Sequence, residues 1–388
     1  MNTPDGAAPP PETIAALQRA RAKFACTALA LQGGGALGAY QAGVFEALEA
    51  ADIEPDWVTG VSIGAINAAI IAGNRPENRV PRLRAFWERI TNAAYALPAP
   101  AATPLHRLFN LGSATAAMAF GAPGFFTPRI VNPWLLPSGV EGATSFYDTS
   151  PLEATLDELI DWKVLNGGRV RLSIGAVNVT TGNFHYFDSA KERIGPRHIM
   201  ASGALPPGFP AVEIDNEAYW DGGLVSNTPL QYLLEWETLR DTLVFQVDLF
   251  SAHGASPADM PAVLARQKEI LYSSRTRANT DAFRRTHQAR AALRAALKRL
   301  PAKALTEQDR AFLADTDDTP QVTILHLIYR RKAYEEQSQD YEFSAASMRE
   351  HWASGHADTL RTLKHPHWLA PPPPEEAVRV HDVHREDP

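Results

Sequence analysis

The segment Gly60-Val61-Ser62-Ile63-Gly64 constrains the fold of this chain more than any other. The strand-like residues 57–59 precede it, and residues 65–72, apolar and rich in helix formers, follow it. A serine therefore occupies a sharp turn from strand to helix, where the flanking positions have no room for a Cβ atom. The turn also places the hydroxyl at a helix N-terminus, where developing negative charge is favoured. The segment predicts either a nucleophile, Ser62, between Gly60 and Gly64, or a glycine-rich turn with an incidental serine.

A second glycine-rich stretch, Gly33 to Gly38, connects an apolar strand to a predicted helix over residues 39–48. A loop of this kind offers backbone N–H groups to an anion, either a phosphate or the oxyanion of an acyl-transfer intermediate. The Gly-Lys-Ser/Thr sequence of a Walker loop is absent. The spacing of Gly33, Gly35 and Gly38 formally matches a dinucleotide-binding motif, but such a site does not explain the serine turn that follows.

The third motif is Asp221-Gly222-Gly223, which follows the strand-like, partly aromatic residues 218–220. An acidic residue between a strand end and two glycines favours a carboxylate held in a tight turn at a functional site. The alternative is an ordinary Asp-Gly hairpin turn.

In this order and spacing, the three motifs resemble the patatin-like phospholipase family, over roughly residues 27–235. The run Ala201 to Pro206 also resembles the family's sequence ahead of the acid, whereas Leu37 stands where members often carry Arg or Lys. The resemblance implies a three-layer α/β/α fold with a mainly parallel central sheet. It further implies a Ser–Asp dyad of Ser62 and Asp221, flanked by Gly60, Gly64, Gly222 and Gly223, with an oxyanion hole at Gly33, Gly34, Gly35 and Gly38.

Composition and patterning divide the chain into four parts. Residues 1–24 are expected to be a flexible arm that ends in a short helix, and residues 25–240 a hydrolase domain whose βαβα start predicts parallel strands. Residues 241–365 are expected to form a mostly helical extension, including a strand over 321–329 and a helical region over 333–363. The Pro-rich, charged residues 366–388 are expected to be a disordered tail.

The hydrolase domain is expected to carry an apolar insertion over residues 92–150. It is rich in proline and glycine and includes Phe125, Phe126 and Trp134. An irregular apolar segment of this length beside a hydrolase site predicts a lid or a lipid-contacting surface. The alternative is that these side chains simply pack on the core.

The extension contains a basic segment, Arg266 to Lys303, with eleven Lys or Arg residues and two acidic ones. Its partly helical apolar stripe allows peripheral contact with an anionic membrane. A solvated face, or packing on an acidic neighbour, is the alternative.

Several classes of protein are disfavoured by composition. The net charge of −7 predicts no general affinity for nucleic acid. The single cysteine, Cys26, excludes an internal disulfide, and no Cys/His cluster suggests a metal, so no cofactor is expected. No uninterrupted apolar run reaches the length of a spanning helix, and residues 1–11 lack the apolar core of a signal peptide. The expected location is cytoplasmic, with peripheral membrane contact as a variant, and the sequence gives no expectation for the oligomeric state.

Three functions are compatible with these patterns. The first is a lipid acyl hydrolase of the phospholipase A or lysophospholipase type, in which desolvation makes Asp221 a better base than its reference pKa of ~3.9 implies. The second keeps the dyad but acts on polyhydroxyalkanoate or short-chain esters. The third is a non-catalytic scaffold that binds a membrane or a partner protein through the basic segment.

Overall fold

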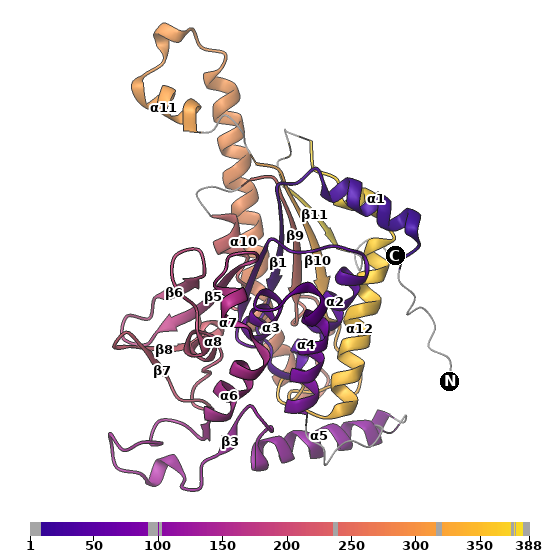
Figure 1. Ribbon diagram of the computed structural model, residues 1–388, viewed down its shortest axis with the longest axis vertical. Coiled ribbons are helices and arrows are strands. Elements are labelled where there is room, and N and C mark those ends of the chain that lie inside the picture. Colours follow the sequence, from indigo (N-terminus) through magenta and orange to yellow (C-terminus); the bar gives the residue numbers. More distant parts are fainter. Residues whose placement is uncertain are drawn as a thin grey trace.

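The computed structural model describes residues 9–91, 100, 103–235, 240–315, 320–373, 376 and 378–382 (Figure 1). Its centre is a nine-stranded sheet in the order β11-β10-β9-β1-β2-β5-β8-β7, with β6 also paired to β5. Six strands are parallel: β1 (Cys26–Leu31), β2 (Trp57–Val61), β5 (Arg171–Asn178), β9 (Thr242–Asp248), β10 (Val322–Ile328) and β11 (Val378–Asp382). Antiparallel strands β6 (Phe184–Asp188), β7 (Val212–Ile214) and β8 (Glu217–Asp221) complete one side.

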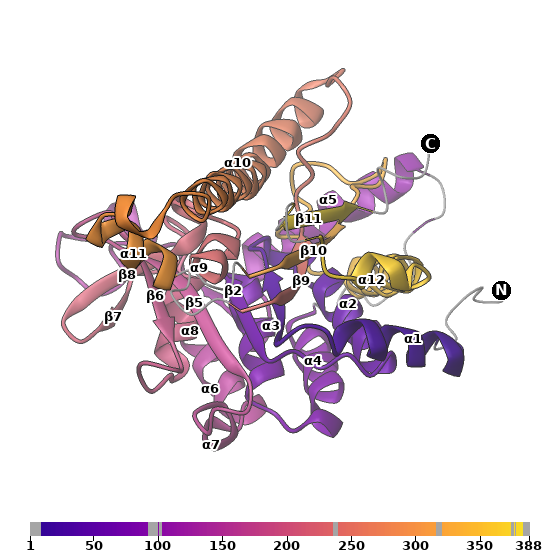
Figure 2. The ribbon, with the colours of Figure 1, turned by 90° about the horizontal axis from the view of Figure 1, so that it is seen from above.

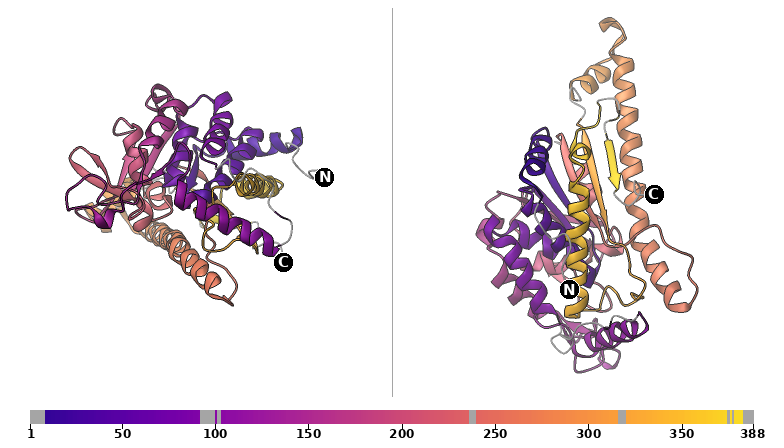
Figure 3. Two further views of the ribbon diagram at one scale, coloured as in Figure 1. Left: turned by 90° about the horizontal axis from the view of Figure 1, so that it is seen from below. Right: turned by 90° about the vertical axis from the view of Figure 1, so that its right-hand side faces the viewer.

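The parallel strands are apolar because both of their faces are covered. Along β1, Leu29 and Leu31 belong to one hydrophobic cluster, while Ala28 and Ala30 belong to the other. Figures 2 and 3 show helices on both sides of the sheet. On one face lie α2 (Ala39–Ala50), α3 (Ile63–Ala72), α4 (Pro76–Ile90) and α12 (Ala345–Leu363), and on the other α9 (Leu230–Leu234) and α10 (Met260–Leu297). The predicted three-layer fold with a mainly parallel sheet is confirmed.

Helices α2 and α12 pack at very close range, although they lie near opposite ends of the chain. A Cβ atom at Gly43 would lie 1.9 Å from the carbonyl oxygen of Trp352, and one at Gly355 would lie 2.0 Å from that of Tyr40. The two glycines therefore let the helix backbones meet directly. As a result, a helix of the C-terminal third is part of the layer that supports the glycine loop.

The remaining elements connect these layers. They are α1 (Pro11–Arg21), η1 (Gly35–Gly38), α5 (Thr103–Phe120), β3 (Thr127–Pro128), η3 (Pro133–Leu135), β4 (Tyr147–Asp148), α6 (Ser150–Leu159), α7 (Trp162–Leu165), α8 (Pro196–Ser202), η4 (Gly222–Leu224), η5 (Ala302–Ala304), α11 (Glu307–Asp315) and η6 (Pro366–Leu369). Within the described ranges, no helix combines the length and apolar character needed to cross a membrane.

The C-terminal third differs from expectation in two places. Residues 333–343 are not helical, because α12 begins at Ala345, where the Ser344 side chain accepts a hydrogen bond from the N–H of Ser347. The tail expected to be disordered forms η6 and β11, because Trp368 and Leu369 are buried and β11 pairs with β10. Strands β9, β10 and β11 also continue the sheet beyond residue 240, so the sheet itself crosses the expected domain boundary.

The molecule is elongated, with different elements at its two ends. The C-terminal end of α10 and α11 project at one end, whereas α5 and β3 lie at the other (Figures 1 and 3). Parallel strands β1, β9 and β10 point their C-terminal ends towards α5 (Figure 1). Loops at this edge carry the residues of the candidate site, as is usual in parallel α/β sheets.

Candidate active site

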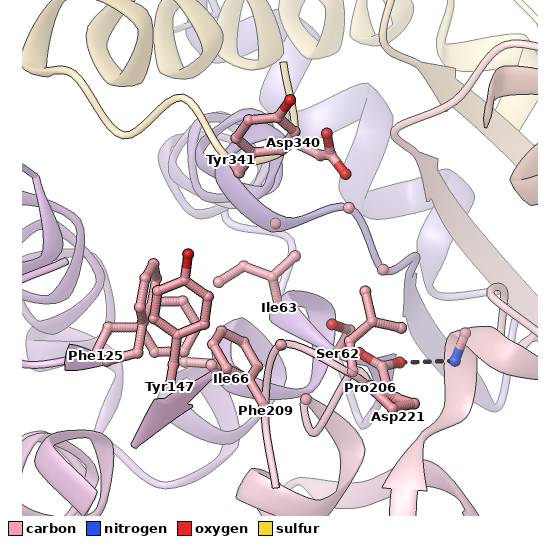
Figure 4. A pocket seen from close by; sticks show the side chains of 18 of the residues that line it. Ser62, Ile63, Ile66, Phe125, Tyr147, Pro206, Phe209, Asp221, Asp340 and Tyr341 are labelled. Carbon is pink, nitrogen blue, oxygen red and sulfur yellow. Dashed lines mark hydrogen bonds between the residues drawn. The ribbon is translucent and has the colours of Figure 1, made fainter. Parts of the chain in front are cut away.

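Ser62 and Asp221 meet because two strands approach each other end to end. Strand β2 runs parallel to β5 and ends with Val61 opposite Gly175, whereas β8 runs antiparallel and ends with Asp221 opposite Ala176. Both strands lie along the same edge of β5, since β6 occupies its other edge. The C-terminal ends of β2 and β8 therefore converge, and Ser62 comes directly after β2 (Figure 4).

The turn at Ser62 has the strained geometry that the sequence predicts. Its φ of 56° and ψ of −126° lie in a region that residues other than glycine rarely adopt. A Cβ atom at Gly60 would lie 2.3 Å from the carbonyl oxygen of Gly64, and one at Gly64 would lie 2.3 Å from that of Leu31. Both flanking glycines are thus required by backbone packing, and the serine hydroxyl is directed towards the pocket.

Asp221 is buried at the end of β8, with only 3% of its surface exposed. Its Oδ1 accepts a hydrogen bond from the N–H of Gly223 at 2.7 Å, which fixes the carboxylate in the turn (Figure 4). Burial raises the pKa of Asp221 to about 6, and hydrogen bonds from the Ser62 hydroxyl and the Gly223 N–H oppose this increase. Asp221 is consequently a stronger base than an exposed aspartate, and it lies beside Ser62 in the wall of the pocket.

The glycine loop has two backbone N–H groups that remain available. The N–H of Gly33 donates to the carbonyl of Asn227 at 3.1 Å, and that of Ala36 donates to the carbonyl of Asp340 at 2.8 Å. Gly34 and Gly35 line the pocket, and no acceptor for their N–H groups is found among the described residues. An anion beside Ser62 can therefore be bound by these two groups.

Gly38 has a different position from the one expected for an oxyanion donor. It lies outside the pocket wall, where a Cβ atom would be 2.6 Å from the Ile63 side chain and its carbonyl accepts a hydrogen bond from Asn67 Nδ2. Gly38 thus allows η1 to pack on α3. Of the four glycines expected at an oxyanion hole, Gly34 and Gly35 are the two that line the pocket with N–H groups that have no acceptor among the described residues.

Ser62 and Asp221 open into a pocket of about 350 Å³ with mostly apolar walls (Figure 4). Among the described residues, no His, Lys or Arg lines it, and no cluster of His, Cys, Asp or Glu has the composition of a metal site. The walls include Ile63, Ile66, Ala117, Met118, Phe125, Phe126, Tyr147, Leu205, Pro206, Pro207, Phe209, Phe250, Tyr272, Tyr341 and Phe343.

The apolar insertion contributes both to this pocket and to the surface. Phe125 and Phe126 are buried and pack against Phe209 and Phe343, so these two residues agree with the core-packing alternative. Trp134 is instead 85% exposed. Residues 92–99 and 101–102 of the insertion lie outside the described residues.

The sequence motifs did not reveal several residues of the site. Asn227 fixes both backbone polar groups of Gly33. Its side-chain Nδ2 donates to the Gly33 carbonyl at 2.9 Å, and its backbone carbonyl accepts from the Gly33 N–H. An Asn-Thr-Pro sequence shortly after the acid motif is the only sequence signal for it. Tyr272, Asp340, Tyr341 and Phe343 come from the C-terminal third, where no pattern pointed to the site.

Two family models match the chain, and one solved structure is similar to it. A family model described as patatin-like phospholipase matches residues 29–234, and another, described as patatin phospholipase, matches residues 270–375. Among solved structures, the chain is similar to VipD from Legionella pneumophila, with 13% sequence identity and a TM-score of 0.41 over 87% of this chain and 67% of that one. No curated protein matches the sequence. The first match contains Ser62, Asp221 and the glycine loop, and the second contains Tyr272 and residues 340–343.

Proposed function

Because the chain belongs to the patatin-like phospholipase family, we propose that it is a lipid acyl hydrolase with Ser62 as nucleophile and Asp221 as general base. Ser62 Oγ attacks the ester carbonyl carbon while Asp221 accepts its proton. Asp221 then returns this proton to the departing alcohol, which leaves an acyl group on Ser62. A water molecule, deprotonated by Asp221, attacks the acyl carbonyl, and the fatty acid departs as Ser62 regains its proton.

The observation that carries this proposal is the position of Asp221 beside Ser62 in the wall of one pocket. Burial raises the pKa of Asp221 to about 6, the Ser62 hydroxyl acts on this pKa in the opposite direction, and no histidine lines the pocket among the described residues. A carboxylate with a raised pKa can serve as base near neutral pH. These observations support a catalytic dyad of Ser62 and Asp221 rather than a triad that includes a histidine.

The negative charge that develops on the carbonyl oxygen requires donors on the other side of Ser62. We assign this role to the N–H groups of Gly34 and Gly35, because the other loop N–H groups discussed above are already bonded within the protein. Removing one oxyanion donor typically costs ~10²–10³ in rate. The loop conformation is therefore central to the reaction.

The pocket walls support the substrate class that we propose. Aromatic and aliphatic side chains surround Ser62, and the pocket lacks a cationic side chain for a small anionic acid among the described residues. The acyl chain of a phospholipid or lysophospholipid fits this environment. A hydroxyalkanoate oligomer or a short-chain ester is the second candidate, because its acyl part has the same apolar character. We also propose a cytoplasmic location, as the sequence leads us to expect.

A peripheral contact with lipid is supported by the outer face of the insertion. Met118 lines the pocket and is half exposed, and α5 and the loop after β3 carry further exposed apolar side chains. Exposed apolar side chains that gather on a surface mark interaction sites, and we propose this role for these residues. This insertion surface comprises Leu105, Leu108, Leu111, Phe120, Ile130, Val131, Trp134, Leu135 and Val140.

The basic segment does not share this location. The C-terminal half of α10 projects with α11 at the end of the molecule opposite to α5 (Figures 1 and 3). A flat bilayer that contacts α5 therefore does not reach this end. We assign lipid contact to the insertion surface and no part of it to the projecting half of the basic segment.

The experiment is an activity comparison of the wild type, Ser62→Ala and Asp221→Asn on phospholipid, lysophospholipid, short p-nitrophenyl esters and hydroxyalkanoate oligomers. We expect both variants to lose nearly all activity on the preferred substrate, because the two residues act as one unit. Alanine variants at the histidines, including His185, His198 and His253, should keep substantial activity. A histidine variant as inactive as Ser62→Ala would replace the dyad by a triad, and an active Ser62→Ala would remove the nucleophile.

A further inference from the structure

Residues 331–340, a segment of the C-terminal third, contact the glycine loop through Asp340. The carbonyl oxygen of Asp340 accepts the hydrogen bond of the Ala36 N–H at 2.8 Å. Gly35 has a φ of +55°, and a Cβ atom there would lie 2.0 Å from the same oxygen. The position of the Asp340 peptide therefore constrains the part of the loop that carries the free N–H of Gly35.

Lys268 holds this segment in place from α10. Its Nζ donates to Asp340 Oδ1 at 2.7 Å and to the carbonyl oxygen of Gln337 at 2.8 Å. The two contacts are three residues apart and clamp the turn between them. Both partners of the ion pair are three-quarters or more buried, so water screens their interaction less than at an open surface. One turn further along α10, Tyr272 lines the pocket.

The preceding part of the segment is anchored more deeply. Glu335 is almost fully buried and accepts hydrogen bonds from the Tyr329 hydroxyl and the Lys332 N–H, while His351 Nε2 lies 2.6 Å from its Oε1. Arg331 pairs with Glu269 at 2.8 Å, next to Lys268 on α10. The start of the segment is thus fixed independently of Lys268, and the Lys268 clamp acts mainly on residues 337–340.

We propose that Lys268 is a positioning residue for the oxyanion hole. By fixing Asp340, it holds the carbonyl that accepts the Ala36 N–H and so keeps the N–H groups of Gly34 and Gly35 aligned with the oxyanion. The inference rests on the proposed hydrolase function. It makes the C-terminal third part of the catalytic apparatus, since residues 268 and 340 lie outside the segment that carries the dyad.

The test compares steady-state kinetics and melting temperatures of Lys268→Met, Asp340→Asn, the double variant and Lys268→Arg. Since the donors are misaligned rather than removed, we expect Lys268→Met and Asp340→Asn each to lower kcat about 10-fold or more, with KM changed less than about 3-fold. The double variant should be no worse than either single one, because both remove the same interaction. Lys268→Arg should recover most of kcat. Arg84→Met, which breaks the Arg84–Glu46 pair of equal length away from the pocket, is the matched control and should leave kcat unchanged.

Two results would overturn the inference. One is an unchanged kcat in both Lys268→Met and Asp340→Asn. The other is a loss of kcat that follows the melting temperature and is not recovered by Lys268→Arg, which would reduce the pair to a stabilising contact. Failure of the hydrolase function itself is recognised separately, because the wild type would then show no activity that depends on Ser62.

Discussion

The hydroxyl of Ser202 connects the strained turn at Ser62 to the central sheet. It accepts a hydrogen bond from the Ser62 N–H at 3.0 Å and donates one to the carbonyl oxygen of Gly175 at 2.7 Å. The unusual backbone angles of Ser62 are therefore stabilised by a buried side chain from α8. Ser202 belongs to the run of residues 201–206, which resembles the family's sequence ahead of the acid.

This relationship predicts a specific effect of Ser202→Ala. The change leaves a backbone N–H and a carbonyl without partners, so unfolding free energy should fall by about 1–3 kcal/mol. Activity should fall as well, because the nucleophile loses its support. Ser189→Ala is the control: Ser189 Oγ accepts a similar hydrogen bond, from the Leu172 N–H at 2.9 Å, away from the pocket. Chemical denaturation and kcat together test the prediction, which fails if both variants affect kcat equally.

A second prediction concerns the pH dependence of the reaction. The base must be ionised to accept the proton of Ser62, and the pKa of Asp221 is raised to about 6 by burial. kcat/KM should therefore be constant above about pH 7 and fall about tenfold per pH unit well below pH 6. A profile that stays flat down to pH 4.5 would argue against Asp221 as the base.

The same shift predicts that Asp221 lowers stability. Because the folded-state pKa is about 6 and the reference value is 3.8, the folded state disfavours the charged form. Below pH 3.8 the group has no effect, and the destabilisation grows as pH rises and is complete above pH 6, where it is worth about 3 kcal/mol. Asp221→Asn should thus be more stable than the wild type at pH 8, with the gain vanishing near pH 4. Denaturation at both pH values tests this, and an equal difference at both would contradict it.

The insertion surface gives a prediction about lipid binding. Trp134→Ser/Leu135→Ser should weaken sedimentation with phosphatidylcholine vesicles at least about tenfold, since each apolar side chain contributes ~1.5–3 kcal/mol when buried. Hydrolysis of a dispersed short-chain ester should be unchanged. Leu293→Ser/Leu300→Ser removes two half-exposed leucines near the far end of α10 and serves as the control. Equal loss of binding in both variants, or strong dependence on salt and anionic lipid, would favour the basic segment instead.

The sequence predicted the parts of the site that are local in the chain. Gly60 and Gly64 predict the turn at Ser62. A Cβ atom at either position would clash with backbone atoms a few residues away or on the adjacent strand. The acid motif at Asp221 was likewise visible as a strand end followed by glycines. The local sequence pattern could not show that Ser62 and Asp221 lie close together, because this depends on β2 and β8 pairing with the same edge of β5.

The part of the site that comes from residues 333–343 could not be predicted either, because its conformation also depends on tertiary contacts. Residues 333–343 have a composition that favours a helix, yet buried partners of Glu335 and the clamp from Lys268 hold them in turns. Such tertiary contacts override local propensity. In contrast, β9, β10 and the helices around the sheet follow apolar patterns that the sequence displays directly.

The central claim is that Ser62 is an activated nucleophile, and fluorophosphonate labelling tests it most directly. A reactive fluorophosphonate should modify the native protein once, and mass spectrometry of the digested protein should place the adduct on Ser62. Labelling should be lost in Ser62→Ala and strongly slowed in Asp221→Asn, because the hydroxyl is then not activated. Absence of labelling at Ser62 in the folded wild type, or an undiminished rate in Asp221→Asn, would contradict the account.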